Sequence, residues 1–295
     1  MRIQLEQFNQ ARRIHGGLFG MWTAALGVRL SRCPVPGPMR THIYRRVYGG
    51  KYDSLNESEL EKPLSEYRSI NELFTRGVPP DQRPLAKNIE STFTVPCDCT
   101  VQTMGSIGQD TTLTVKQTDY RLETLAPQTD VACFRNGRFA ILFLSPRDCH
   151  RVFSPQSGTL DAVTHVPGSR FPVHPPFQRP EFPVFTLNER LVMELTTPLG
   201  RCMVIMVAGW GVGHITHPFE LPLRPHRRKV QRLQLTDPRK VSANEWLATF
   251  ELGSTVVFVT EGTRTFDTQL AAGDSLHFGQ SLFSEVTHTA ESLRS

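Results

Sequence analysis

A serine inside an apolar segment near the carboxyl end is the first candidate for chemistry. Residues 250–259 have the sequence FELGSTVVFV, and its β-branched and aromatic residues predict a buried strand interrupted by the small triplet Gly253-Ser254-Thr255. A glycine within a strand often marks a bulge, so one interpretation is a kinked strand with a polar edge. The other is self-cleavage. Ser254 attacks the carbonyl of Gly253, an N-to-O acyl shift gives an ester, and β-elimination leaves a pyruvoyl group at position 254.

Three other segments carry groups that could assist such chemistry. Asp98, in the sequence VPCDC at 95–99, could orient a base or accept a proton; the alternative is a carboxylate in a surface turn. His150 lies between two arginines in the sequence RDCHR at 147–151, which favours its neutral form near pH 7. The alternative for His150 is a loop of ion pairs. The sequence NER at 188–190 precedes an apolar strand, and the alternative there is a turn capped by Asn188.

A metal site is a further alternative. Cys97, Cys99, Cys149 and His150 match the ligand types of a Cys3His zinc site. The Cys-x-Cys spacing is tighter than in zinc ribbons, and no further ligand pattern accompanies it. We therefore expect no metal, with the thiols as small buried side chains.

The composition narrows the class of protein. The 295 residues are 39% hydrophobic and 21% charged, which is typical of a folded globular protein. The net charge of +5 suits a polyanionic partner, and without an RNA-binding or zinc-finger pattern we expect an anionic membrane surface and no nucleic acid. Six cysteines without a signal peptide indicate a reducing compartment. No apolar run approaches the ~20 residues that span a bilayer.

The basic residues are concentrated at the N-terminus, where residues 1–51 contain nine Arg or Lys and one acid. Residues 18–30 predict an apolar helix that lies in the lipid interface or packs on its own domain. Further helices are predicted over 39–48 and over 67–76, the latter with a capping box formed by Ser69 and Glu72. The basic sequence RPHRRK at 224–229 predicts a solvated loop.

From about residue 93 the chain consists of short apolar runs separated by Gly, Pro and Asn, which is typical of β structure. These runs cover residues 93–95, 139–144, 191–195, 203–207 and 256–259. We therefore expect an α+β protein. Residues 1–62 would form a basic, helical, membrane-associating region, and residues 63–295 a mainly antiparallel β domain that resembles a barrel or sandwich.

Taken in order, these segments resemble the phosphatidylserine decarboxylase family over about residues 73–283. LFTR at 73–76 with RPL at 83–85 resembles the family's LF-x-R and RP-[LI], and PCD at 96–98 resembles its P-A-D-G. Lys116, Tyr120 and Leu122 follow its K-G-x-x-Y-x-L. FRNG at 134–137 and LSPRDCHRV at 144–152 resemble its F-x-x-G and L-S-P-x-D-Y-H-R-x-H. VPG at 166–168, NER at 188–190 and LGST at 252–255 match outright.

This resemblance implies a proenzyme that cleaves itself between Gly253 and Ser254 into a β chain, residues 1–253, and an α chain, residues 254–295. Ser254 becomes the pyruvoyl cofactor. Its carbonyl forms a Schiff base with the amine of phosphatidylserine and accepts electrons as CO2 leaves, which yields phosphatidylethanolamine for phospholipid biosynthesis. By position, His150 matches the family histidine for substrate binding and proton delivery, and Asp98 the aspartate of the self-cleavage triad. The family also implies a homodimer and a peripheral location on the cytoplasmic face of the cell membrane.

Four positions depart from the family pattern. The triad histidine is replaced by Phe153, which cannot accept a proton from Ser254. Family glycines are replaced by Cys99, Gln117 and Ala248, which predicts altered backbone near the site. Three outcomes follow: another group such as His150 activates the serine, cleavage is slow, or the chain is an unprocessed, non-catalytic relative that binds lipid surfaces.

Overall fold

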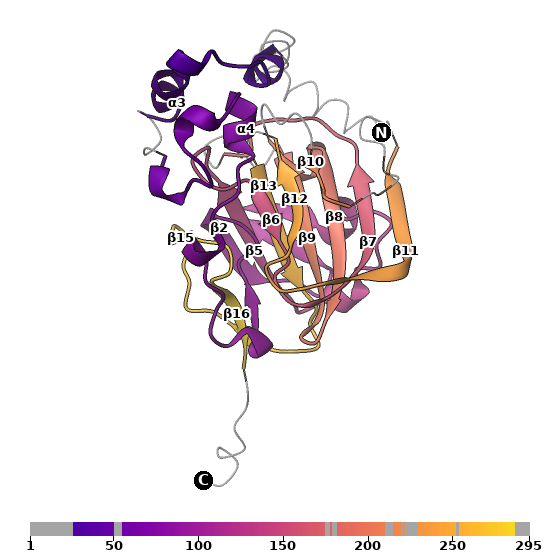
Figure 1. The fold of residues 1–295 in the computed structure, drawn as a ribbon. Helices are drawn as coiled ribbons and strands as arrows, with labels where there is room; N and C mark the ends of the chain where they lie inside the picture. The colour runs from indigo at the N-terminus through magenta and orange to yellow at the C-terminus, as the bar shows by residue number, and fades with distance from the viewer. Residues whose placement is uncertain are drawn as a thin grey trace.

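The computed structural model describes residues 26–49, 55–174, 178, 182–209, 215–219, 221, 223, 229–251 and 254–286. Short helices gather at one end of a largely β structure (Figure 1). The α+β class predicted from the sequence is confirmed.

Within these residues, no helix combines the length and the apolar character needed to cross a membrane.

The N-terminal part consists of short helices with a core of their own. Residues 26–31 are helical, and η1 (Gly37–Met39) leads into α3 (Arg40–Tyr48), which confirms the helix predicted over 39–48. Most of the helix predicted over 18–30 lies outside the described residues. After η2 (Glu57–Glu59) and η3 (Leu64–Glu66) comes α4 (Ile70–Phe74). Six buried side chains join these elements: Tyr44, Tyr48, Leu64, Tyr67, Leu73 and Phe74.

Helix α4 is shorter than predicted, and only half of its capping box forms. The Oγ of Ser69 accepts a hydrogen bond from the N–H of Glu72 at 3.1 Å, as expected of an N-cap. The Glu72 carboxylate instead accepts from the N–H of Arg68 at 2.7 Å, one residue before the cap. Because Pro79 and Pro80 follow closely, the helix cannot extend far beyond Phe74.

Eight antiparallel strands form the main sheet, in the order β11-β7-β8-β9-β13-β5-β2-β15. The predicted runs at 139–144, 191–195, 203–207 and 256–259 all lie in it, which confirms them as strands. The strands are β2 (Cys99–Ser106), β5 (Arg138–Leu144), β7 (Gly158–Val166), β8 (Arg190–Thr197), β9 (Gly200–Ala208), β11 (Gln231–Val241), β13 (Ser254–Thr260) and β15 (Ser275–Leu276).

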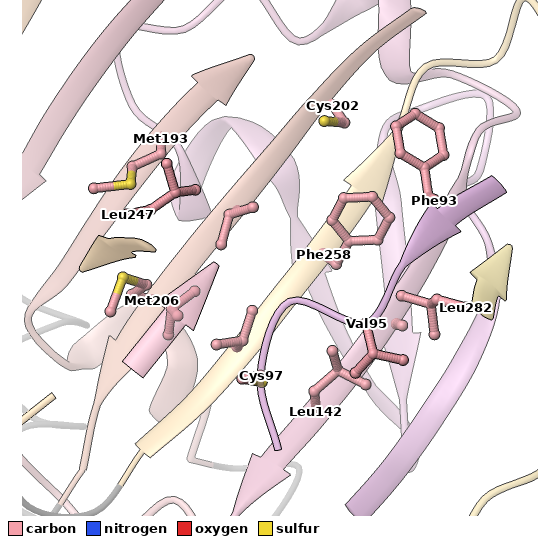
Figure 2. Packing of buried hydrophobic residues seen from close by; sticks show 14 of the residues in the cluster. Phe93, Val95, Cys97, Leu142, Met193, Cys202, Met206, Leu247, Phe258 and Leu282 are labelled. Carbon is pink, nitrogen blue, oxygen red and sulfur yellow. The ribbon is translucent and has the colours of Figure 1, made fainter. Parts of the chain in front are cut away.

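Both faces of this sheet are covered. One face packs on a small sheet, β10-β12-β6, and the two sheets share a core that includes Met206, Leu247 and Phe258 (Figure 2). The other face packs on the hairpin of β3 and β4 and on helices α5 and α6. The elements are β6 (Arg151–Phe153), β10 (Ile215–Thr216), β12 (Trp246–Phe250), β3 (Thr112–Val115), β4 (Thr118–Arg121), α5 (Leu122–Leu125) and α6 (Val184–Leu187).

The remaining elements lie at the edges. A third sheet has the order β1-β16-β14, and its strand β1 confirms the apolar run predicted at 93–95 apart from its last residue. These strands are β1 (Thr92–Thr94), β14 (Phe266–Asp267) and β16 (Ser281–Glu285). Three 3-10 segments complete the structure: η4 (Pro80–Gln82), η5 (Ile89–Ser91) and η6 (Ala132–Phe134).

The segment 250–259 is not the single interrupted strand predicted from its sequence. Phe250 ends β12 in the small sheet, whereas Ser254 begins β13 in the main sheet. Gly253 lies outside the described residues. The prediction failed because both halves contribute to one core and so have the same apolar composition. Consequently, the chain passes from one sheet to the other between Phe250 and Ser254.

The expected departure from regular backbone is seen at two of the three replaced glycines, since Gln117 has a positive φ and a register shift lies between Trp246 and Ala248. Cys99 and Ala248 lie within β2 and β12. Lys116 and Gln117 form the two-residue loop between β3 and β4, with φ of 46° and 67°. Two positive φ values are typical of a type I′ turn, in which Asn-Gly is the favoured pair. Gln117 therefore holds a conformation that glycine adopts more easily.

Replacing Gln117 by glycine should therefore stabilise the protein. A left-handed residue costs about 1–2 kcal/mol unless it is glycine, and the added freedom of the unfolded chain offsets part of that gain. We expect Gln117→Gly to raise the free energy of unfolding by about 1 kcal/mol, measured by urea denaturation. Arg121→Gly is the control, because Arg121 is exposed at the end of the same hairpin in extended backbone, and it should destabilise. A destabilised Gln117→Gly variant would contradict the turn assignment.

Candidate active site

The motif residues meet at one end of the main sheet. Ser254, the first residue of β13, pairs with Leu144 at the end of β5 and with Ala208 at the end of β9. The N–H of Ala208 donates to the carbonyl of Glu189, just before β8. Cys99 begins β2 at this same end. Directly paired residues point to the same face, and Val256, two residues along β13, faces the core shared with the small sheet. Ser254 therefore also faces the small sheet.

The hydroxyl of Ser254 is fully buried and has no hydrogen-bond partner among the described residues. The same holds for the hydroxyls of Thr255 and Ser145, its neighbours along β13 and beyond the end of β5. A buried hydroxyl without a partner costs about 1–3 kcal/mol. Such groups are rare in folded proteins, and a functional role is one accepted explanation for them.

His150 presents a free ring nitrogen in the same part of the fold. Its imidazole is buried, and Nδ1 lies 2.8 Å from the carbonyl oxygen of Asp148. Because a carbonyl only accepts, Nδ1 carries the proton, and Nε2 of the neutral ring has a lone pair. Nε2 has no partner in the part of the chain that the structure describes. The ring of Phe74 from α4 lies 3.7 Å away and fixes the imidazole plane.

Burial, rather than the flanking arginines, keeps His150 neutral. Desolvation lowers its pKa to about 3, and the nearby charge of Arg76 acts in the same direction. The neutral form predicted from the sequence is therefore supported, but its main cause differs. The alternative of an ion-pair loop describes its neighbours, since Arg147 pairs with Asp148 and Arg151 with Glu61, whereas His150 itself is buried. The backbone N–H of Phe250 donates to the carbonyl of His150 at 3.0 Å and ties it to the end of β12.

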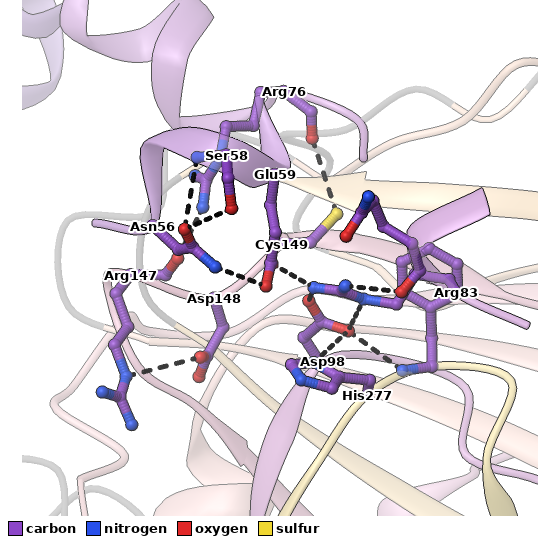
Figure 3. Close-up of polar contacts among 12 residues, drawn as sticks. Asn56, Ser58, Glu59, Arg76, Arg83, Asp98, Arg147, Asp148, Cys149 and His277 are labelled. Carbon is purple, nitrogen blue, oxygen red and sulfur yellow. Dashed lines mark hydrogen bonds and ion pairs between the residues drawn. The ribbon is translucent and has the colours of Figure 1, made fainter. Parts of the chain in front are cut away.

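Asp98 is a buried, fully engaged carboxylate, so the surface-turn alternative is wrong. Arg83 donates to both of its oxygens, at 3.1 and 2.7 Å, and the N–H of Phe278 donates at 2.9 Å (Figure 3). His277 approaches to 3.5 Å. Burial alone would raise the pKa of Asp98, but the hydrogen bonds from His277 and Arg83 outweigh it and lower the pKa. No hydrogen bond joins Asp98 to Ser254 or His150 in the described residues.

Phe153 lies beside this carboxylate cluster. Its ring stacks on Phe278 with centroids 4.0 Å apart and planes 20° apart, and both pack with Val78 and Cys149. Since the backbone N–H of Phe278 binds Asp98, a histidine at position 153 would lie close to that carboxylate.

Two motifs that are separate in the sequence form one unit next to Ser254. A Cβ on Gly168 would lie 2.5 Å from backbone atoms of Asn188 and Glu189, so only glycine allows this contact. The side-chain amide of Asn188 donates to the carbonyls of Phe171 and Ala208, both at 2.8 Å, and its oxygen accepts from the N–H of Phe171. Asn188 therefore holds the VPG loop against the strand that flanks Ser254. Asn188 is also the C-cap residue of α6, so the alternative of a turn capped by Asn188 is part of this arrangement.

The cysteines give no metal centre. Cys97, Cys99 and Cys149 are buried and free, and burial raises the pKa of Cys149 to about 12. No group of three or more His, Cys, Asp or Glu side chains within the described ranges could hold a metal ion. Among the described residues, Cys97, Cys99, Cys149 and His150 are therefore not arranged as a zinc-ligand set.

Comparison with known proteins agrees with this geometry. The family model described as phosphatidylserine decarboxylase matches residues 70–284. The chain belongs to the phosphatidylserine decarboxylase family. It is similar to the phosphatidylserine decarboxylase proenzyme of Anaeromyxobacter sp. (strain K), with 33% identity over 262 residues that cover 86% of this chain and 90% of the relative. The proenzyme of Polaromonas sp. is 32% identical over 83% of this chain and 88% of its own length. The resemblance found in the motifs is thus confirmed.

Within this decarboxylase-family site, the sequence did not lead us to predict the partners of Asp98. Arg83 binds Asp98 and also Glu59, which links the helical part to the site. The family match of RPL at 83–85 was the available signal for Arg83. Nothing in the sequence pointed to His277, which is 179 residues from Asp98.

The burial of His150 makes a testable contribution to pH dependence. The folded pKa is about 3 and the unfolded pKa about 6.5, so the unfolded chain binds the proton first as pH falls. His150 therefore destabilises the fold progressively below about pH 6.5, by at most about 1.4 kcal/mol per pH unit. We expect His150→Gln to remove this part of the pH dependence, measured by urea denaturation between pH 4.5 and 7.5. If the free energies of unfolding of the wild type and the variant changed equally with pH, His150 would be accessible to protons in the folded protein.

Proposed function

We propose that this protein is a self-processing phosphatidylserine decarboxylase, which converts phosphatidylserine to phosphatidylethanolamine and CO2. The proposal rests on the family match and on one observation. The hydroxyl of Ser254 is buried and unpaired among the described residues, and His150 accepts a backbone hydrogen bond from Phe250, four residues before Ser254. Cleavage before Ser254 would divide the protein into a β chain of residues 1–253 and an α chain of residues 254–295.

Position 254 suits a pyruvoyl group. The unpaired hydroxyl supports this fit. A buried polar atom without a hydrogen-bond partner is expected where that atom is to react in the precursor. When formed, the group supplies the carbonyl that binds the substrate amine and the electron sink for loss of CO2. The surrounding strands exclude water, and His150 holds or delivers a proton through Nε2. Because burial keeps His150 neutral near pH 7, it would deliver only a proton that Nε2 has first taken up during the reaction.

The proposed maturation uses groups of the chain and one water molecule. The Oγ of Ser254 bonds to the carbonyl carbon of Gly253, the C–N bond breaks, and the hydroxyl proton passes to the released nitrogen. Nε2 of His150 is the available base, since Phe153 cannot serve. Loss of the Cα proton of residue 254 then breaks its Cβ–O bond and frees the carboxylate of Gly253. Water hydrolyses the resulting imine and releases ammonia.

Processing gives a direct test. Purified wild-type protein should resolve into two fragments divided before Ser254, with a C-terminal fragment that resists Edman sequencing and lacks the mass of one ammonia. It should release CO2 from phosphatidylserine. Ser254→Ala should stay a single chain without activity. A wild-type protein that remains one chain after prolonged incubation would refute self-processing.

Phe153 supports a second candidate function, an unprocessed lipid-surface binding protein, because the family base is absent. Phe153→His separates the two. A positioned base typically contributes 10²–10⁴-fold, so the variant should cleave at least about 100-fold faster if the scaffold is competent. Phe153→Tyr is the control, since it keeps the stacking on Phe278 without adding imidazole. A time course on denaturing gels measures both rates. An intact wild type and an unchanged Phe153→His variant would favour the binding protein.

We also propose that the helical part rests on an anionic membrane. Four exposed apolar side chains lie there, namely Leu26, Leu30, Met39 and Val47, with exposures of 40%, 59%, 53% and 50%. Exposed Arg29 and Arg46 add positive charge. Arg32 forms an ion pair with Glu251, close to the cleavage position. Lipid bound at these helices would therefore lie near the proposed site.

A vesicle experiment tests this surface. The paired variant Leu30→Asp and Met39→Asp should bind phosphatidylserine-containing vesicles at least about tenfold more weakly, since each buried apolar side chain contributes about 1.5–3 kcal/mol. Leu85→Asp is the control, because Leu85 is exposed outside this region. Co-sedimentation at fixed ionic strength measures the affinity. Equal weakening by the control, or none by the paired variant, would contradict the proposed membrane face.

A further inference from the structure

A second charged cluster lies at the same sheet end as Ser254. The Oε2 of Glu189 accepts from Nε and Nη2 of Arg170, at 3.0 and 2.8 Å. The Oε1 of Glu189 lies 3.1 Å from Nε2 of His165. The exposures of the side chains are 9% for Glu189, 7% for His165 and 30% for Arg170. Burial would raise the pKa of Glu189, but the hydrogen bond from His165 and the charge of Arg170 lower it.

The strand register places this cluster on the same face as Ser254. His165 on β7 pairs with Leu191, Leu191 pairs with Met206, and Met206 pairs with Val256. These partners face the core under the small sheet, and Ser254 is two residues from Val256. Only Ala208, with its single methyl group, lies between the backbone of Glu189 and that of Ser254. Two strand spacings separate those backbones, about 10 Å.

We propose that Arg170 binds the phosphodiester of the substrate headgroup, and that Glu189 and His165 are the residues that position it. This inference rests on the proposed decarboxylase function. Glu189 holds one side of the guanidinium, and no hydrogen bond in the described part of the chain uses Nη1. Arg170 is also the most exposed member of the cluster. Guanidinium groups recognise phosphate through paired, charge-assisted hydrogen bonds.

The dimensions of the substrate agree with this assignment. In a phosphoserine headgroup, four single bonds separate the amine nitrogen from phosphorus, about 5 Å when extended. A hydrogen bond of about 2.8 Å then joins a phosphate oxygen to a guanidinium nitrogen. With the amine against residue 254, the phosphate would lie within reach of a cation that is held two strands away.

The carboxylate of the serine headgroup is the less suitable partner. An arginine paired with that carboxylate would stabilise the substrate more than the transition state, in which its charge disperses as CO2 leaves. The phosphodiester keeps its charge throughout the reaction, so binding it strengthens substrate affinity without opposing decarboxylation.

Two measurements test the role of Arg170. The first is calorimetric binding of glycerophosphoserine, which has no acyl chains, to the uncleavable Ser254→Ala protein. Adding Arg170→Gln should weaken binding by about 10- to 100-fold, as expected for a hydrogen bond to a charged group. Arg170→Lys should restore part of the affinity. Arg138→Gln should have no effect, because Arg138 begins β5 at the opposite end of the sheet.

The second measurement uses processed enzyme. Arg170→Gln should cleave as the wild type does, raise KM for short-chain phosphatidylserine by about 10- to 100-fold and leave kcat nearly unchanged. Binding within twofold of the parent, no binding by the Ser254→Ala parent at millimolar glycerophosphoserine, or a loss confined to kcat would overturn the assignment. A wild type that neither cleaves nor releases CO2 would instead refute the proposed function. The binding measurement on the Ser254→Ala protein would still test whether Arg170 binds the phosphodiester.

Discussion

Ser254 lies where its hydroxyl cannot reach water, because strands β5 and β9 flank its backbone and packed layers cover both faces of the sheet. In such surroundings an unpaired hydroxyl is destabilising, so the fold must support it through packing elsewhere. The fully buried strand β13 supplies that support. The same dry surroundings strengthen any electrostatic interaction made by this hydroxyl.

The helical part contributes to the site as well as to the surface. Phe74 packs on the imidazole of His150, and the guanidinium of Arg76 donates to the carbonyl of Arg147 in the loop before it. Arg83 connects Glu59 of the helical part with Asp98 of the β part (Figure 3). Because these contacts are buried or half-buried, a displacement of the helices would also disturb the orientation of His150. The helical part and the surroundings of His150 are therefore mechanically coupled.

Much of this arrangement could be predicted from the sequence, because short motifs and apolar runs are local signals. They indicated the main strands and helix α3 correctly, and the structure shows that Ser254 and His150, which the motifs singled out, are both buried. Three features escaped prediction because they depend on tertiary contacts. The change of sheet between Phe250 and Ser254 is hidden by one shared core, the partners of Asp98 come from distant segments, and Arg170 meets Glu189 only after β7 and β8 pair. Gln117 shows a further limit, since a left-handed turn can form without glycine.

The place of β13 between β5 and β9 determines how a matured protein would behave when it unfolds. A break before Ser254 leaves the shorter piece hydrogen-bonded along both edges, so the two pieces remain one compact body. If the proposed processing occurs, folding would precede it, because only the assembled sheet creates the surroundings of the hydroxyl. Once denatured, however, the separated pieces would have to meet by diffusion, and recovery would depend on their concentration. Long-term persistence of the mature form would then be governed by how slowly it opens rather than by a reversible equilibrium.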